Sequence, residues 1–417
     1  MNDLKFINVN QLFGENVIQR NDELNDKIKS LNSQNLSYDK KTKTLEFRNI
    51  EFEEILFKES LLELSSNVKL QANMFIVFNN CKFNKIEFIK FDVPIGKFPK
   101  DNIDYKDDIR GIEFNWNNKI NQSLEIKIKN SKFYGKFYIN KQYDNNDKKT
   151  IIKELEIKET LFEENFKLNN CEIKKIFIKD SDFKKNVYFY NCEFNEGTDE
   201  KKRINFRNVN FKGLTLFGDC EFSNKTNFKY VTFESHAHFR DTNFNKGLNL
   251  DYANIEKEMN FFDVKGLDSK ISKLNTSQET YRIIKHQFEK LNNKIESNKY
   301  HALEMEQHRK NIWEKIFNDC NSFYKLLPDG IVSFVHWLSS NHSSNWSLAL
   351  FWIFIVSFIT TFNLGLDVSI DNIFKYINIL SKIEDFNNSY IAMTLNKLSL
   401  GYLYYQFLTA VRKDTRK

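Results

Sequence analysis

The sequence predicts a mainly β protein, built as a four-sided parallel β-solenoid and followed by a helical connector and a transmembrane helical hairpin. Three observations lead to this prediction. Phe accounts for 41 of 417 residues, whereas Gly and Pro number only 12 and 3. Hydrophobic residues recur every five or six positions through much of the chain, and residues 346–366 carry no charge. The scarcity of Gly and Pro excludes collagen and Pro-rich disorder, and it argues against the Gly-rich phosphate loops of nucleotide-binding enzymes.

Residues 1–42 precede the repeat and are expected to form an N-terminal cap, partly helical around residues 22–31. This segment has no apolar core of signal-peptide length. The chain has 5 cysteines, an odd number without a CxxC pair, which argues against a disulfide framework or a zinc knuckle. We therefore expect the bulk of the chain to lie in a reducing cytoplasm.

Residues 43–267 carry the repeat. A period of five or six fits neither a helix nor a plain strand, but it fits a coil whose sides each have two inward residues and an outward turn. Four sides make one coil of about 20–22 residues, and the inward Phe side chains should stack about 4.8 Å apart. In the clearest stretch, a large anchor follows a smaller or apolar residue two positions earlier. The predicted core includes the anchors Phe211, Leu216, Phe222, Phe233 and Phe244, and the smaller residues Cys220 and Ala237.

This pattern resembles the pentapeptide-repeat proteins, whose units centre on Leu or Phe with a small residue two positions before. The resemblance covers about residues 43–265 and implies a right-handed quadrilateral β-helix. The sequence departs from the family pattern in its frequent six-residue sides and in three polar insertions, near residues 94–122, 141–151 and 195–203. We expect these insertions to leave the coil as loops, either as partner contacts or as neutral decorations.

Residues 268–325 are predicted to form a helical connector. A helix should begin near Thr276 or Ser277, and an apolar stripe at steps of three and four runs through residues 281–312. Two interpretations remain open: a helix that seals the end of the solenoid, or a coiled coil that makes the protein a homo-oligomer. The segment also resembles the connector of membrane-bound bacterial pentapeptide-repeat proteins.

Residues 326–345 are predicted to lie at a membrane interface, and residues 346–411 to form a two-helix transmembrane region. The first span is long enough for the roughly 30 Å hydrocarbon core of a bilayer, and Trp346 lies at its end as an interfacial anchor would. Trp352 lies within this span. The second span is weaker, because Lys397 lies near one end and would have to snorkel; a surface-lying amphipathic helix is the alternative. Tyr404 belongs to this segment.

The distribution of basic residues predicts the orientation of the hairpin. The tail at residues 412–417 and the connector are rich in Lys and Arg, whereas the loop at residues 367–390 has few. We therefore expect a two-pass protein of the bacterial cytoplasmic membrane with both termini in the cytoplasm. The C-terminal sequence also resembles that of the membrane-bound pentapeptide-repeat group.

Catalytic chemistry is not indicated by the sequence. It contains no nucleophile elbow, Walker motif, HExxH motif or kinase signature, so we expect neither an enzyme nor a cofactor. His236 and His238 would point outward, but two ligands make a poor metal site. His301, Glu304 and His308 share one helical face, which is better interpreted as a solvated surface than as a metal site.

The expected function is a non-enzymatic, membrane-anchored scaffold that binds the lipid bilayer and an unknown protein partner. The net charge is 62 − 56 = +6, and the repeat is nearly neutral, so no nucleic-acid partner is expected. The alternative is an oligomeric channel-like effector with the β-helix as sensor, in which Asn396, Lys397 and Gln406 face a bundle interior. The only string that is similar to a potassium filter, residues 400–402, lies within the second span rather than between the two. A topoisomerase-binding DNA mimic, as some soluble pentapeptide-repeat proteins are, is a third and weaker hypothesis.

Overall fold

The computed structural model describes residues 36–39, 44–49, 51–58, 75–91, 111–116, 123–141, 149–195, 204–318 and 320–415. The chain divides into two units, Met1–Thr276 and Ser277–Lys417, and each is described by itself. The helix predicted around residues 22–31 lies outside the described residues. Of the predicted cap, the structure describes only a short strand.

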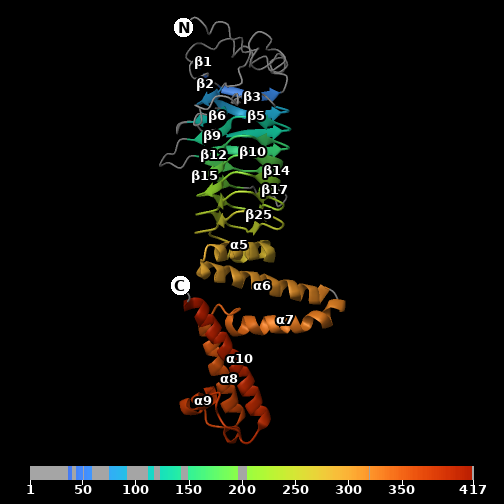
Figure 1. Cartoon of the computed structure of the whole chain (residues 1–417), viewed down its shortest axis with the longest axis vertical. Helices are drawn as coiled ribbons and strands as arrows, with labels where there is room; N and C mark the ends of the chain where they lie inside the picture. Colours follow the sequence, from blue (N-terminus) through green and yellow to red (C-terminus); the bar gives the residue numbers. More distant parts are fainter. Residues whose placement is uncertain are drawn as a thin grey trace. The chain divides into compact units, whose positions relative to one another are not determined.

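One sheet of the first unit, sheet A, contains ten of the described strands, seen edge on in Figure 1. In spatial order they are β1 (Leu36–Asp39), β2 (Thr44–Arg48), β4 (Phe75–Asn79), β6 (Gly111–Trp116), β9 (Lys136–Lys141), β12 (Phe166–Asn169), β15 (Val187–Tyr190), β18 (Thr215–Gly218), β22 (Ala237–His238) and β26 (Met259–Asn260). Strands β2 to β26 pair in parallel, each with the strand one coil further along the chain. Strand β1 pairs antiparallel with β2 at the N-terminal edge.

The other sheet, sheet B, contains sixteen described strands. They are β3 (Glu51–Lys58), β5 (Lys82–Ile89), β7 (Ser123–Lys129), β8 (Lys132–Phe133), β10 (Thr150–Lys158), β11 (Leu161–Phe162), β13 (Cys171–Ile173), β14 (Ile176–Phe183), β16 (Glu193–Phe194), β17 (Ile204–Phe211), β19 (Glu221–Phe222), β20 (Thr226–Asn227), β21 (Thr232–Phe233), β23 (Asn243–Phe244), β24 (Leu248–Asn249) and β25 (Asn254–Ile255). Its parallel pairs form three ladders, which with sheet A make the four sides of each coil. The predicted parallel solenoid is therefore confirmed.

The core consists of columns of Phe rings that continue from coil to coil. In one column, Phe222 lies between Phe194 and Phe244, with ring centroids 4.4 Å and 4.9 Å away and planes within 5° of parallel. A second column joins Phe211 to Phe233 at 5.3 Å. These spacings match the separation of paired strands, because each ring projects from the same position of successive coils.

Residues in the left-handed conformation turn two of the four corners. Most precede a small or β-branched residue, as Asp219 (φ 51°) precedes Cys220 and Asp241 (φ 57°) precedes Thr242. Asn and Asp tolerate this conformation better than other non-glycine residues, because their short side chains can hydrogen-bond locally. The coil therefore turns without the glycines that such corners would otherwise need, which accounts for the low Gly content.

Two predictions for the repeat are wrong in detail. Leu216, predicted as an anchor, is only half buried, and Phe217 points inward instead, with its ring 4.8 Å from that of Phe189. The extra residue in the turn at Gly213 shifts the register by one, and a one-residue shift exchanges the two faces of a strand. The predicted insertions are also too long, since residues 111–116 form β6 and Thr150 begins β10; the remaining insertion residues lie largely outside the described part.

A short helix, α4 (Lys270–Asn275), closes the last described coil of the first unit. The hydroxyl of Ser272 donates to the carbonyl of Phe244 (3.1 Å), and the amide of Leu248 donates to the Thr276 hydroxyl (3.2 Å). Backbone groups at the open end of the solenoid thus find partners, which protects a sheet edge from pairing with another chain.

The second unit is helical (Figure 1). Its described helices are α5 (Gln278–Lys290), α6 (Lys294–Asn318), α7 (Cys320–Ser340), α8 (Trp346–Asn363), α9 (Ile370–Ile377), the 3₁₀ helix η4 (Ile383–Phe386) and α10 (Tyr390–Thr415). Ser277 caps α5 as predicted, with its hydroxyl accepting from the amide of Thr280 (3.1 Å).

The connector folds back on itself, so the prediction of one continuous helical stripe over residues 281–312 is wrong. Asn292 is left-handed (φ 56°) and separates α5 from α6. Tyr281 and Phe288 of α5 then pack against Tyr300 of α6, at 6.4 Å and 5.5 Å between ring centroids. Because the stripe is largely buried within one chain, homo-oligomerisation through this segment stays a prediction.

Helix α8 is the one helix in the described part that is long and apolar enough to span a membrane. The second predicted span lies within α10, which is long but too polar to meet the same criterion. The structure therefore supports one apolar helix and does not support the predicted transmembrane hairpin. Ala349, Ile353, Ser357 and Thr361 form the buried stripe of α8, and Ile353 packs with Leu400 of α10.

Candidate interaction surface of the solenoid

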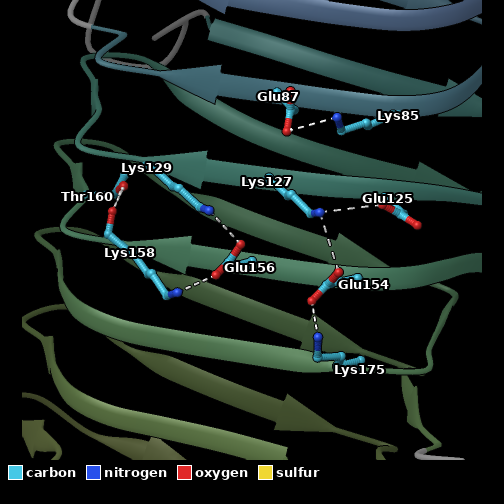
Figure 2. Close-up of polar contacts among 10 residues, drawn as sticks. All are labelled: Lys85, Glu87, Glu125, Lys127, Lys129, Glu154, Glu156, Lys158, Thr160 and Lys175. Atoms are coloured by element: carbon cyan, nitrogen blue, oxygen red, sulfur yellow. Dashed lines mark hydrogen bonds and ion pairs between the residues drawn. The ribbon is translucent and has the colours of Figure 1, made fainter.

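A lattice of charged side chains covers one face of sheet B across β5, β7, β10 and β14 (Figure 2). Most outward residues on these strands are Lys or Glu, and the lysines pair with glutamates of the same or a neighbouring strand. Lys127 lies between Glu125 (3.6 Å) and Glu154 (3.7 Å), from its Nζ to a carboxylate oxygen in each case. Glu156 accepts from both Lys129 (3.0 Å) and Lys158. The charges on this face thus neutralise one another.

The pKa values of the lattice agree with this pairing. Burial opposes the charged form of Glu156, but hydrogen bonds from Lys158 and Lys129 hold its carboxyl pKa below the usual value. Burial likewise opposes the charged form of Lys127, yet the carboxylates of Glu154 and Glu125 raise its pKa. Exposed ion pairs contribute only about 0–1 kcal/mol each, and a partner would have to displace them. The lattice is therefore a weak candidate for a binding surface.

Sheet A presents a different surface, which we call the amide–tyrosine face: Asn79, Asn115, Asn140, Asn169, Tyr138, Lys167, Tyr188 and Tyr190. The Asn side chains form a ladder, in which Asn140 donates to Asn115 and Asn115 donates to Asn79, each at 3.2 Å. The side-chain oxygens of Asn140 and Asn169 are buried and have no hydrogen-bond partner in the described part. Unsatisfied amide oxygens of this kind are acceptors that a ligand could use.

A groove of about 710 Å³ follows this ladder, lined by the four asparagines with Glu46, Glu113, Trp116, Tyr138 and Lys167 among others. The ammonium of Lys167 lies 6.0 Å from the ring centre of Tyr138. Further along the face, Asn186 donates to the hydroxyl of Tyr188 (2.9 Å), and Tyr190 is 46% exposed. Tyr is enriched at interaction hot spots, because its ring buries a large area while its hydroxyl keeps a hydrogen bond.

The residues predicted for the core lie inside the solenoid. Phe211, Phe222, Phe233, Phe244 and Ala237 are fully buried, and Cys220 is nearly so. Their role is structural stacking, and none reaches the surface. A candidate interaction surface therefore consists of the outward residues between them. The repeat pattern in the sequence identifies only the inward residues and does not point to these.

The residues predicted for the membrane region lie on α8 and α10. Trp346 begins α8 and is partly exposed. Trp352 donates its indole N–H to the carbonyl of Leu338 (2.8 Å), and Tyr404 donates its hydroxyl to the carbonyl of Ile377 (3.0 Å). Lys397 is half buried on α10.

The described residues contain no group of three or more His, Cys, Asp or Glu side chains placed to hold a metal ion. In the second unit, Glu304 instead accepts from Arg282 and Lys285, each at 2.8 Å. His301 lies 3.9 Å from the same carboxylate. This arrangement joins α5 to α6 and is a structural ion-pair network.

Sequence reasoning missed a buried polar cluster where α7, α8 and α10 meet. It contains His336, Ser340, His342, Ser343 and Gln406. The available signal was the polar string at residues 339–345 between two apolar segments. From sequence alone, we expect that string only to belong to a membrane-interface segment that precedes the first span.

The parallel coils, the four ladders and the stacked rings define the described part of the first unit as a parallel β-solenoid. Residues 206–254 match the pentapeptide repeat family, in 9 copies. The matched residues run from β17 to the start of β25, the stretch in which the coils follow one another without an insertion. No curated protein and no solved structure matches the chain.

Proposed function

We propose that this protein is a non-enzymatic scaffold that is anchored in the bacterial cytoplasmic membrane and displays its solenoid in the cytoplasm. On this proposal the solenoid is right-handed, as parallel crossover connections almost always are. Helix α8 spans the bilayer, α10 returns beside it, and both chain ends lie on one side. The amide–tyrosine face binds a protein partner.

The surface of α8 is the observation that carries the membrane proposal. Only 22% of the apolar window in this helix is buried within the protein, whereas the core helix of a soluble protein would be mostly buried. Its large side chains point outward, and Phe351, Phe358 and Phe362 are all exposed. An exposed apolar surface of this size is stable in contact with lipid.

The pairing of polar residues between the helices supports α10 as the second arm. Asn396 donates its side-chain amide to the hydroxyl of Thr360 on α8 (2.9 Å), and Gln406 accepts hydrogen bonds from two Ser hydroxyls. Polar side chains in a membrane-spanning helix pair with neighbouring helices in this way. The same pairing disfavours the channel hypothesis for a single chain, because the amide nitrogen of Asn396 and the side-chain oxygen of Gln406 are bonded to neighbouring residues rather than facing a pore.

The charge lattice bears on the DNA-mimic hypothesis. Such a mimic needs a continuous acidic surface, whereas Glu125, Glu154 and Glu156 each lie beside a lysine of the same face. Protein binding through the amide–tyrosine face is therefore the function that the described surface favours.

Flotation of the full-length protein with native membranes tests the anchoring. We expect the protein to float with membranes and to resist extraction at high salt and at alkaline pH. A variant with Phe351→Asp and Phe358→Asp should enter the soluble fraction, while Phe177→Ser on the solenoid should not alter the distribution. Recovery of the unmodified protein in the soluble fraction would overturn the proposal.

Site-specific photo-crosslinking tests the binding face in intact cells. A photoreactive residue in place of Tyr188 should give discrete adducts, and these should weaken when Tyr138 is changed to Ser. The matched control is the same photoreactive residue in place of Phe177, which lies on the charge lattice, with Lys158 5.0 Å from its ring. Equal labelling from both positions would contradict the assignment of the amide–tyrosine face.

A further inference from the structure

The turn between α7 and α8 is strained and buried. Three consecutive residues, Asn341, His342 and Ser343, adopt left-handed conformations with φ of 48°, 59° and 60°. Such conformations cost about 1–3 kcal/mol for residues other than glycine and are concentrated at functional sites. His342 is fully buried and Ser343 nearly so. The surrounding hydrogen bonds must compensate for this strain.

Those hydrogen bonds define the proton positions on two histidines. The side-chain oxygen of Gln406 accepts from the hydroxyls of Ser340 (2.9 Å) and Ser343 (2.7 Å). The Ser343 hydroxyl has one hydrogen, and it donates that hydrogen to Gln406. Its oxygen must therefore accept a hydrogen bond from Nε2 of His336, 3.0 Å away. Nδ1 of His336 then lacks a proton and accepts from Nδ1 of His342 (3.3 Å). Nε2 of His342 is left as a bare, buried nitrogen with no partner among the described residues.

Two cations of the helical unit have no carboxylate partner among the residues that the structure describes. The guanidinium carbon of Arg309 on α6 lies 4.4 Å from the ring centre of Trp337, and its buried Nε has no hydrogen-bond acceptor in the described part. Lys413 near the end of α10 is half buried. The neighbouring carboxylates are engaged elsewhere, Glu304 with Arg282 and Lys285, and Glu306 with Lys310 (3.2 Å).

Each cation lowers the pKa of one histidine of the pair. Burial, then His336, then Arg309 lower the pKa of His342 to about 4. Burial and then Lys413 lower the pKa of His336. Burial and the nearby Lys285 in turn lower the pKa of Lys413. The region therefore has an excess of partly buried positive charge, which an anion would compensate.

We propose that Arg309, Lys413 and the His336–His342 pair form a binding site for a phosphate group, with an anionic phospholipid headgroup as its source. The guanidinium offers a free N–H and the ammonium offers three, and both residue types bind phosphate oxygens. Beside a phosphate, His342 gains a proton at Nε2 and becomes a further donor.

The position of the site favours a lipid, and this step depends on the membrane anchoring proposed above. Ser343 lies three residues before Trp346, where the apolar helix α8 begins, so the cluster lies at the polar end of the apolar surface. Partly buried cations at this level of a membrane protein bind anionic headgroups, and Trp337, stacked on Arg309, is typical of the interfacial region.

Native mass spectrometry of the full-length protein, solubilised in detergent with defined lipids, tests the site. The unmodified protein should retain phosphatidylglycerol at least about tenfold more strongly than phosphatidylcholine. Arg309→Gln with Lys413→Gln should remove at least about tenfold of that affinity, a loss of about 1.4 kcal/mol or more. Lys310→Gln is the matched control, since it neutralises the adjacent cation that is paired with Glu306, and it should change the affinity less than about twofold.

Two further measurements separate the sources of phosphate and exclude a folding effect. Inorganic phosphate should compete for the site only weakly if a lipid is the ligand; equal binding of inorganic phosphate supports the site but assigns it to a free phosphate. In either case NMR of the His342 side chain should show its pKa rising when the ligand binds, which a merely structural cluster would not show. Equal retention of both lipids together with an unmoved His342 pKa overturns the inference. Failure of membrane flotation would instead overturn the anchoring and leave the inorganic-phosphate titration as the test of this site.

Discussion

At the scale of single residues, stacking in register decides which side chains form the core. Phe217 lies between Phe189 and Phe239, with ring centroids 4.8 Å and 4.9 Å away. Its neighbour Leu216 is the better match to a step of five from Phe211, yet it faces outward. The rings of the two neighbouring coils therefore determine which residue of this strand points inward, since a shift of one residue would break the aromatic column at this coil.

The two neighbours give a direct test of this register. Phe217→Ala should lower the free energy of unfolding by about 3–5 kcal/mol, because it removes a buried ring and leaves a cavity between two others. Leu216→Ala should lower it by less than about 1 kcal/mol. Chemical denaturation monitored by circular dichroism measures both values, and an equal effect of the two substitutions would show that the register is different.

The cysteines of the solenoid give a second test at this scale. Cys81, Cys171, Cys192 and Cys220 are buried, and burial raises the pKa of the Cys220 thiol, so the reactive thiolate is scarce and shielded. In a Cys320→Ser background, we expect no thiol to react with Ellman's reagent until denaturant unfolds the solenoid. Rapid labelling of the folded protein would place these side chains on the surface.

At the scale of elements, the α5–α6 hairpin depends on one buried carboxylate. Glu304 of α6 is 5% exposed and joins Arg282 and Lys285 of α5. Burial opposes its charged form, but hydrogen bonds from His301, Lys285 and Arg282 lower its pKa to about 2. Two cations shared by one carboxylate fix how the two helices are paired.

The pKa of Glu304 predicts how the stability of the hairpin depends on pH. The folded value lies below the ordinary value of 4.5, so the stabilisation is fully present above about pH 4.5 and is lost as the pH falls towards 2. We expect Glu304→Gln to destabilise the second unit by about 2 kcal/mol at pH 7 and to flatten its acid dependence. Thermal unfolding between pH 2 and pH 7 measures both effects.

Glu314→Gln is the matched control for this prediction. Glu314 lies on the same helix but is exposed, and its substitution should leave both the stability and its acid dependence nearly unchanged. Parallel pH profiles of the unmodified protein and Glu304→Gln would contradict the role assigned to the buried carboxylate.

At the scale of the whole molecule, the chain consists of two units with different sources of stability, divided between Thr276 and Ser277. The solenoid is stabilised by contacts between neighbouring coils, whereas the helical unit depends on helix packing and a few buried polar contacts. We therefore expect two unfolding transitions. Phe217→Ala should lower the first unit's transition alone, and Glu304→Gln the second unit's alone, as measured by calorimetry in detergent. A single transition shifted by both substitutions would show that the units unfold together.

Local regularity made the solenoid predictable. Hydrophobic residues that recur every five or six positions predict two inward residues on each side of the coil. This prediction works wherever the chain repeats without interruption, as it does over residues 206–254. The prediction is wrong where one residue is added, as at Gly213, or where a strand such as β6 follows a polar segment. In these places the neighbouring coil, whose paired strand lies more than 20 residues away in sequence, decides the register.

The interaction surface and the phosphate site could not be predicted in this way. Outward residues carry no periodic signal, so the sequence does not distinguish the self-paired charge lattice from the amide–tyrosine face. Asn79 meets Asn115, and Ser343 meets Gln406, only after coils stack and helices pack.

The sequence by itself determined the parallel solenoid, a helix start near Thr276 or Ser277 and the apolar segment that became α8, because each follows from local composition or a short-range repeat. Only the tertiary structure decided that α5 and α6 pair as a hairpin, that the lysines and glutamates neutralise one another, and that His336 and His342 form a pair. These features depend on contacts between residues far apart in the chain, and their energies are set by distance and burial, which a linear sequence does not contain.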